Sequence, residues 1–295
     1  MSPSLYSELQ AELDARARAG LTRRRRLLQS AQSAQIQCDG QTVLSFCSND
    51  YLGLANHPVL IAAVKDSVDA LGVGSGASHL ITGHHQSHER LEQALAEFVG
   101  LPSALLFSTG YMANLGVVSA LVGRDDAVFA DKLNHASLND AVVLSRAELH
   151  RFAHNDMAAL EKLLRASTAK RKLIVVDAVF SMDGDVAPVR ELVALCERYD
   201  AYLLLDDAHG FGVLGKQGRG VLDHAGLRSP RIIYMATLGK AAGVAGAFVA
   251  GEAVLIDYLV QQSRTYIYTT ASPAMLSSGL LAALQVMQED AARHT

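Results

Sequence analysis

The sequence of 295 residues has few cysteines and no CxxC spacing, and this shortage excludes two classes of protein. Its three cysteines, Cys38, Cys47 and Cys196, are odd in number. Together these facts argue against a disulfide scaffold and against a structural zinc site, and they favour a reducing cytoplasm. We interpret each cysteine as a small packed hydrophobic residue.

The sequence also lacks a basic excess and a long apolar run. Lysine and arginine total 26 against 30 acidic residues, so the net charge of −4 argues against a nucleic-acid footprint spread over the protein. No run approaches the roughly 18 apolar residues that cross a bilayer. The Arg-rich beginning does not resemble a secretory signal. We therefore expect a cytoplasmic protein that binds neither nucleic acid nor membrane.

What is present is the pattern of an α/β fold. Half of the residues are hydrophobic, which excludes global disorder. Short, almost continuously apolar runs alternate with segments of helical period, as expected for a mostly parallel sheet covered by helices on both faces. A helix-rich segment over about residues 1–35 precedes them, and residues 273–290 predict a long helix. The predicted strands are Ala104–Phe107, Ala127–Ala130, Leu173–Phe180, Tyr202–Asp206, Ile232–Ala236 and Ala247–Ala250.

Polar residues follow two of these strands, where ligands bind in open α/β sheets. Asp206 ends one strand and His209 comes three residues later, so an anion and an imidazole can meet one planar ligand. A helix N-cap followed by a surface histidine is the alternative interpretation. Lys240 follows the next strand in an apolar, small-residue setting that suits Schiff-base chemistry. A surface lysine is the alternative there, and the flanking residues exclude a P-loop.

A third segment, Ser108–Tyr111, lies between a predicted strand and a helix. Such a glycine-containing turn presents free N–H groups and can bind phosphate, although a turn without a ligand explains it almost as well. Taken together, a phosphate cup, a strand-end aspartate and a later strand-end lysine are the parts that hold pyridoxal 5′-phosphate (PLP).

Seven stretches give the chain a specific resemblance. They are distributed over the whole of residues 45–270, and they are FCSNDYLGLANHP (46–58), GSGASHLITGHHQSHERLE (74–92), LNHASLNDA (133–141), RFAHND (151–156), VFSMDGDVAP (179–188), DDAHGFGVLGKQGRG (206–220) and TLGKAAGVAG (237–246). In these stretches the chain resembles the α-oxoamine synthase family of fold-type I PLP-dependent enzymes.

The resemblance implies an aspartate-aminotransferase-like α/β fold in three parts. We expect an N-terminal helical arm over residues 1–44, a large PLP-binding domain over 45–275, and the start of a C-terminal small domain over 276–295. Members of the family continue into a C-terminal domain that supplies the arginine for the amino-acid carboxylate. We expect this small domain to be truncated here.

The resemblance also implies roles for individual residues. Lys240 would form the Schiff base and act as acid and base, Asp206 would pair with the pyridinium nitrogen, and His209 would bond the phenolic oxygen. His135 would stack on the ring and reach the acyl thioester. The other implied contacts are cofactor contacts of Gly110, Tyr111, Ser181 and Thr237, substrate contacts of Asn49 and Arg23, and phosphate contacts of Thr269 and Thr270 across a homodimer with a shared active site.

The reaction implied is an acyl transfer. Within the family the motifs are most similar to the biotin-pathway member, which condenses L-alanine with pimeloyl-CoA or pimeloyl-acyl carrier protein and releases carbon dioxide. Members that use glycine with acetyl-CoA, or serine with palmitoyl-CoA, remain alternatives. A non-catalytic ligand-binding relative is the alternative from another class.

Three further patterns have competing interpretations. The run Arg23–Arg26 is a solvated face, a patch for anions, or the source of one arginine that binds an acyl carboxylate. His84 and His88 share a helical face, but no HExxH motif and no third ligand is evident, so we predict no metal site. The spacing of Gly72, Gly74 and Gly76 is GxGxG after a helical segment, so we reject a dinucleotide fingerprint.

Overall fold

The computed structural model describes residues 4–289, and it divides into two compact units at Cys47 and Ser48. The N-terminal unit contains helix α1 (Leu5–Arg18) and a hairpin of β1 (Gln35–Cys38) and β2 (Gln41–Leu44). Asp39 and Gly40 both have positive φ in the two-residue turn of this hairpin, as type I′ turns require. The helix therefore covers a smaller part of residues 1–35 than the sequence predicts.

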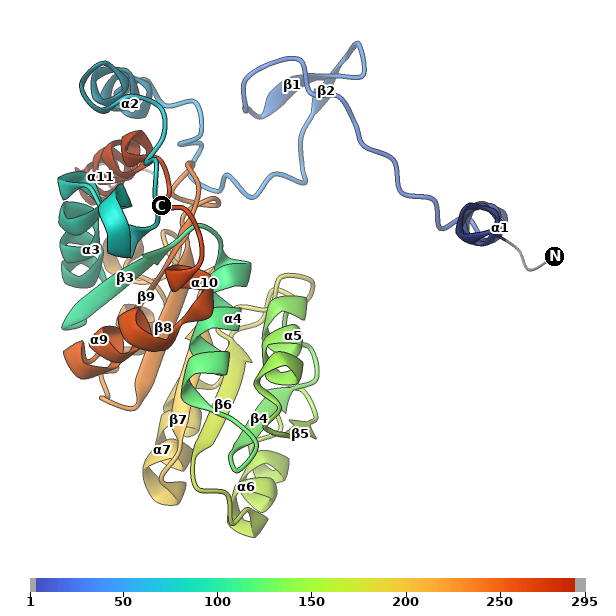
Figure 1. Cartoon of the computed structure of the whole chain (residues 1–295), viewed down its shortest axis with the longest axis vertical. Helices are drawn as coiled ribbons and strands as arrows, with labels where there is room; N and C mark the ends of the chain where they lie inside the picture. The colour runs from blue at the N-terminus through green and yellow to red at the C-terminus, as the bar shows by residue number, and fades with distance from the viewer. Residues whose placement is uncertain (1–3, 290–295) are drawn as a thin grey trace. The chain divides into compact units, whose positions relative to one another are not determined.

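The second unit contains a seven-stranded sheet in the order β3-β9-β8-β7-β6-β4-β5 (Figure 1). Strands β8, β7, β6, β4 and β5 pair in parallel, whereas β9 is antiparallel to both of its neighbours. The sheet is therefore mostly parallel, as the sequence predicts. The strands are β3 (Ser103–Phe107), β4 (Ala127–Asp131), β5 (Glu148–Phe152), β6 (Lys172–Asp177), β7 (Tyr202–Asp206), β8 (Ile232–Thr237) and β9 (Ala247–Gly251).

Helices cover both faces of this sheet (Figure 1). They are α2 (Pro58–Leu71), the π-helix η1 (His79–Gly83), α3 (Gln86–Val99), α4 (Gly110–Leu121), α5 (Ala136–Ser145), α6 (Met157–Ala166), α7 (Val189–Tyr199), the 3₁₀ helix η2 (Lys216–Gly218), α8 (Val221–Ala225), α9 (Ala253–Gln262), α10 (Arg264–Ile267) and α11 (Ala274–Glu289).

The strands are apolar almost continuously because each face packs against helices. Leu203 and Leu205 of β7 belong to a hydrophobic cluster with α3, α6, α7, α8 and α11. The intervening Leu204 belongs to a second cluster, with α4, α5, α9 and α10. Alternate side chains of one strand thus enter two separate cores. This packing holds the carboxyl ends of the parallel strands at one edge of the sheet.

Five of the six predicted strands agree with the structure to within one residue, one predicted strand ends earlier, and one observed strand of this sheet was not predicted. The segment predicted as Leu173–Phe180 ends as a strand at Asp177, because the chain then turns toward an isolated bridge between Val179 and Val186. Strand β5 was not predicted. It is the edge strand of the sheet, and its sequence ELHRF has only its last residue buried, so it lacks the apolar run of the others.

The predicted terminal helix is α11, which packs against α2 and α3 and buries Leu280, Ala283 and Met287 in the first of the two cores. The division into residues 1–44, 45–275 and 276–295 stays a prediction. Among residues 4–289, no helix is long and apolar enough to cross a membrane.

Candidate active site

The carboxyl ends of β6, β7 and β8 bring the predicted functional residues together. Asp177 pairs with Asp206 in the register of β6 and β7, and Asp206 pairs with Met235 of β8. The loop after β8 then carries Lys240, and the loop after β7 carries His209. The strand-end arrangement is thus a consequence of parallel pairing.

Lys240 takes part in a chain of hydrogen bonds. Its Nζ lies 2.8 Å from Nε2 of His209, and Nδ1 of His209 lies 2.7 Å from the hydroxyl of Tyr51. That hydroxyl donates to Oδ1 of Asn49 at 3.2 Å. The Tyr51 hydroxyl uses its only proton toward Asn49, so it accepts the Nδ1–H of His209. In the neutral ring, Nε2 of His209 then carries a lone pair and accepts a hydrogen bond from the Lys240 amine. The chain fixes His209 as a neutral imidazole that orients the amine.

Burial shapes the charge states of this pair. It lowers the pKa of Lys240 from its ordinary value, against the opposing effect of the Asp206 and Asp177 charges. Burial, and next the positive charge of Lys240, lowers the pKa of His209 to about 4. The histidine is therefore neutral at pH 7. The lysine keeps a larger fraction of its amine unprotonated than an exposed lysine does, which makes it a better nucleophile and base.

Asp206 is 5% exposed and held by two hydrogen bonds. Its Oδ1 accepts the N–H of Ala208 at 3.1 Å, and its Oδ2 accepts Nδ2–H of Asn114 at 2.8 Å. Within residues 4–289 no lysine or arginine forms an ion pair with it. A buried carboxylate without a cationic partner is costly, and a ligand that carries an N–H⁺ group would offset this cost.

Asp177 stands beside Asp206 as a second buried carboxyl group. Burial, and next the charge of Asp206, raises the pKa of Asp177 to about 8. Burial also raises the pKa of Asp206, but its hydrogen bonds from Asn114 and Ala208 and the charge of Lys240 oppose this rise. The two carboxyl groups therefore titrate as a coupled pair, and burial and their mutual repulsion raise the affinity of the pair for a proton.

His135 is the N-cap residue of α5, and Asp177 also positions it. Its backbone N–H donates to Oδ2 of Asp177 at 2.9 Å. The N–H of Ser137 donates to Nδ1 of His135 at 3.2 Å, and the Ser137 hydroxyl lies 2.7 Å from the same nitrogen. The neutral ring therefore carries its proton on Nε2. Because Ser137 also accepts from Asn114 at 2.9 Å, a continuous set of hydrogen bonds joins His135 to Asp206.

The start of α4 provides the predicted phosphate cup. Thr109 is the N-cap, and its hydroxyl accepts the N–H of Met112. The N–H groups of Gly110 and Tyr111 have no partner within the helix, because they lie in its first turn. A Cβ on Gly110 would lie 2.6 Å from Cγ2 of Thr237, so only glycine allows this close approach of α4 to β8. Tyr111 donates a hydrogen bond to Asp140, and this bond raises the pKa of the Tyr111 hydroxyl.

These features fit PLP. The N–H groups at the α4 terminus and the Thr237 hydroxyl are donors for a phosphate. Asp206 is a buried carboxyl group that forms no ion pair with a lysine or arginine among the described residues, although the charge of Lys240 lowers its pKa, so it can contact a protonated pyridine nitrogen. Lys240 supplies an amine of lowered pKa. All of these groups lie on one unit of the chain.

The remaining predicted residues are not joined to this network. Ser181 is exposed in the turn after Phe180, and Thr270 is exposed beyond α10 next to the half-buried Thr269. Within residues 4–289 the side chains of these three residues make no hydrogen bond. Arg23 belongs to the N-terminal unit. The roles assigned to these four residues stay predictions.

Four residues of the network were missed in the sequence analysis: Tyr51, Asn114, Ser137 and Asp177. For two of them, the sequence contains a feature that could have identified them as site residues. Asp177 ends a predicted strand in the same way as Asp206, and Asn114 is a polar residue inside the apolar helix GYMANLGVVSAL. The sequence contains no such feature for Tyr51 and Ser137, since tyrosines in loops and serines at helix starts are common.

The chain is similar to known proteins over most of its length. It matches the family "Aminotransferase class I and II" over residues 41–295. It is 65% identical to the 8-amino-7-oxononanoate synthase of Methylobacillus flagellatus over 289 residues, which are 98% of this chain and 73% of the relative. The same enzyme of Nitrosospira multiformis is 61% identical over 97% of this chain and 72% of the relative.

Solved structures have the same fold. The Sphingomonas wittichii serine palmitoyltransferase superposes with a TM-score of 0.90 at 33% identity, over 97% of this chain and 73% of that chain. The Francisella tularensis 8-amino-7-oxononanoate synthase superposes with a TM-score of 0.73 at 34% identity, over 84% and 70%. These structures agree with the fold-type I arrangement predicted from the sequence.

Proposed function

Because the chain belongs to the class I and II aminotransferase family, and within it to the 8-amino-7-oxononanoate synthases, we propose that it condenses L-alanine with a pimeloyl thioester in biotin biosynthesis. The acyl carrier is CoA or acyl carrier protein, and the products are 8-amino-7-oxononanoate, the free thiol and carbon dioxide. The observation that carries the proposal is the hydrogen-bonded placement of Lys240, Asp206 and His135 around one strand edge.

PLP, when bound, supplies an electron sink for a carbanion at the alanine Cα. Asp206 keeps the proton on the pyridine nitrogen, since the buried carboxylate favours a cationic partner. Lys240 removes the proton from Cα and later returns one, because burial lowers its pKa and so raises the fraction of free amine that can act as the base. His209 orients the amine through its Nε2.

His135 acts on the second substrate. With its proton on Nε2, the ring can donate to the thioester oxygen as negative charge develops there. The bond between Cα and the acyl carbon forms, the carbon–sulfur bond breaks, and the thiol leaves. The carboxylate is then lost as carbon dioxide. Ser137 and Asn114 hold the donor in place and exclude the tautomer with a proton on Nδ1.

The expected homodimer would complete this site. In the proposal, Thr269 and Thr270 contact the phosphate bound by the partner subunit, Arg23 and Asn49 contact the acyl substrate, and Ser181 approaches the ring edge. A cytoplasmic location belongs to the same set of predictions.

A thiol-release assay tests the proposal. We expect product from L-alanine with pimeloyl-CoA or pimeloyl-acyl carrier protein, and at least about tenfold lower kcat/KM with glycine or serine. Acetyl- and palmitoyl-thioesters are the matched controls for the acyl chain. A preference for serine with palmitoyl-CoA would overturn the proposal in favour of the activity named for the serine palmitoyltransferase neighbours. PLP binding without any thiol release would indicate a non-catalytic protein.

A further inference from the structure

A cavity of about 630 Å³ lies beside α3, among side chains that the proposed reaction does not use. His79, His84, Glu89 and Glu92 contribute to its lining, and Tyr266 closes one side. Imidazole and carboxylate groups therefore meet at one wall of an open space that a ligand can enter.

Three ligand atoms of this wall lie close together. Nε2 of His84 is 3.4 Å from Oε2 of Glu89 and 3.9 Å from Oε2 of Glu92. The two glutamates are three residues apart on α3, so they share one face of the helix. A tetrahedral zinc ion bound at about 2.0–2.2 Å places its ligand atoms about 3.3–3.6 Å apart. The cluster needs only small side-chain adjustments to reach this geometry.

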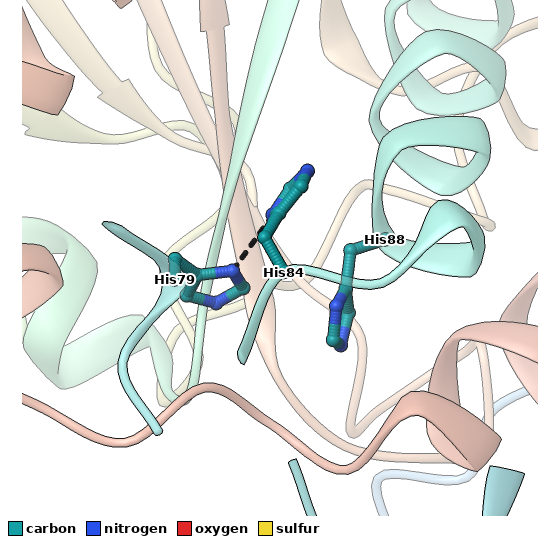
Figure 2. A group of neighbouring side chains, drawn as sticks. All are labelled: His79, His84 and His88. Carbon is teal, nitrogen blue, oxygen red and sulfur yellow. Dashed lines mark hydrogen bonds between the residues drawn. The ribbon is translucent and has the colours of Figure 1, made fainter. Parts of the chain in front are cut away.

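His79 determines which nitrogen of His84 faces the glutamates. Nδ1 of His79 lies 2.9 Å from Nδ1 of His84 (Figure 2). The His79 ring is 8% exposed and is stacked on Tyr266 at 4.9 Å, so it is held in place. When Nδ1–H of His84 donates to His79, the Nε2 lone pair of His84 points to the carboxylates. This second hydrogen bond is how proteins orient a ligating histidine.

His88 lies near these rings but does not join the ligand set. Its Nε2 donates to the carbonyl of Ser272 at 2.8 Å, and its Nδ1 accepts the N–H of His85 at 3.0 Å. In Figure 2 the rings of His84 and His88 extend in opposite directions. Both nitrogens of His88 are therefore committed to hydrogen bonds that hold the start of α3.

Glu92 is a buried carboxyl group with one oxygen directed at His84. The residue is 9% exposed, and its Oε1 accepts the N–H of Leu106 at 2.8 Å. Its Oε2 faces only His84, and no lysine or arginine pairs with it among residues 4–289. Burial raises the pKa of this carboxyl group to about 8, so a metal ion that binds here would displace its proton at pH 7.

We propose that His84, Glu89 and Glu92 bind a divalent transition-metal ion of the zinc class. His79 is a positioning residue, and the remaining coordination position opens to the cavity. One nitrogen and two carboxylate oxygens suit zinc and its neighbours in the first transition row. From the sequence we predicted no metal at His84 and His88, because it shows no HExxH motif and no third ligand; the structure adds Glu89 and Glu92 beside His84. The proposal does not depend on the reaction at Lys240.

Zinc binding to the purified full chain tests the proposal. After chelator treatment, titration with ZnCl₂ against a chromophoric chelator should show one site per chain. Glu89→Gln, on the exposed face of α3, should weaken binding at least about tenfold, and His84→Gln about a hundredfold. Glu97→Gln, which removes a carboxylate from the same helix and cavity, is the matched control and should leave the affinity unchanged.

A second measurement separates His79 from a structural role. His79→Phe keeps a ring against Tyr266 but loses the acceptor, and it should weaken zinc binding about 10–100-fold while the circular dichroism spectrum is unchanged. No zinc site in the wild-type chain, or equal affinities in Glu89→Gln and the wild type, would overturn the proposal. An affinity that depends on His88 and not on Glu89 would also overturn it.

Discussion

Two polar clusters of the second unit differ in how their charges are balanced. At the strand edge, the positive charge of Lys240 opposes the repulsion between Asp177 and Asp206. At the cavity wall, Glu89 and Glu92 face an imidazole, and no lysine or arginine pairs with them among the described residues. The strand edge thus contains its own cation, which suits a reversible proton transfer, whereas the cavity wall contains ligand atoms that suit an added cation.

The clusters also differ in their supports. The strand-edge residues follow strands that are packed on both faces, and hydrogen bonds through Asn114 and Ser137 connect them. The wall residues come from one helix and the loop before it. Strand ends are held by the whole sheet, so small changes there should affect catalysis more than stability.

The largest expected effect is that of Lys240→Ala. Activity should fall more than about 10⁴-fold, because both the covalent anchor and the base at Cα are lost. Borohydride should no longer trap PLP on the chain, and zinc affinity should be unchanged. Lys216→Ala, on an exposed lysine, is the control. An unchanged visible spectrum and rate would contradict the assignment.

Asp206→Asn should come next, with a fall in kcat of about 10³-fold, because an amide does not stabilise a protonated pyridine nitrogen. The amide keeps an acceptor for Ala208, so the urea midpoint should change little. Glu92→Gln is the contrasting variant, since it should abolish zinc binding and leave kcat unchanged. The measurements are steady-state kinetics and chelator competition. A kcat that depends on Glu92 would remove the distinction between the two clusters.

A smaller effect is expected from Ser137→Ala. The variant loses the hydroxyl that links Nδ1 of His135 to Asn114, so the ring is less well oriented. We expect kcat to fall about tenfold with little change in the KM for alanine. Ser145→Ala, on the same helix but away from the site, is the control. A change confined to the KM for alanine would argue against an orienting role.

The smallest effect concerns the pH dependence of stability. The pKa of Asp177 is raised in the folded protein to about 8, so its contribution to stability is complete below about pH 4 and is lost as the pH rises toward 8. Asp177→Asn should reduce the decline in the free energy of unfolding of the PLP-free chain by about 2 kcal/mol between pH 6 and 8. Urea titrations at several pH values measure it. An equal decline in the variant and the wild type would show that Asp177 is already ionised in the folded chain.

The sequence by itself determined the strand edge. Asp206, Thr237 and Lys240 each come at or after the end of an apolar strand, and Gly110 begins the helix that follows another apolar strand. The local sequence pattern and the expected parallel sheet therefore suffice to place these residues at one edge of the sheet. The strand β5 and the hairpin of residues 35–44 were not predicted. Their sequences are polar and almost none of their side chains are buried, so they lack the hydrophobic pattern that indicates a strand.

Only the tertiary structure decided which side chains touch. Asp177 and Asp206 are neighbours because of the register of two strands, although the two residues lie far apart in the chain. The path from Asp206 through Asn114 and Ser137 to His135 joins four segments. His79, His84, Glu89 and Glu92 meet because a π-helix and a loop fold back on α3. Hydrogen bonds act over a few ångströms, and the packing of distant segments sets such distances.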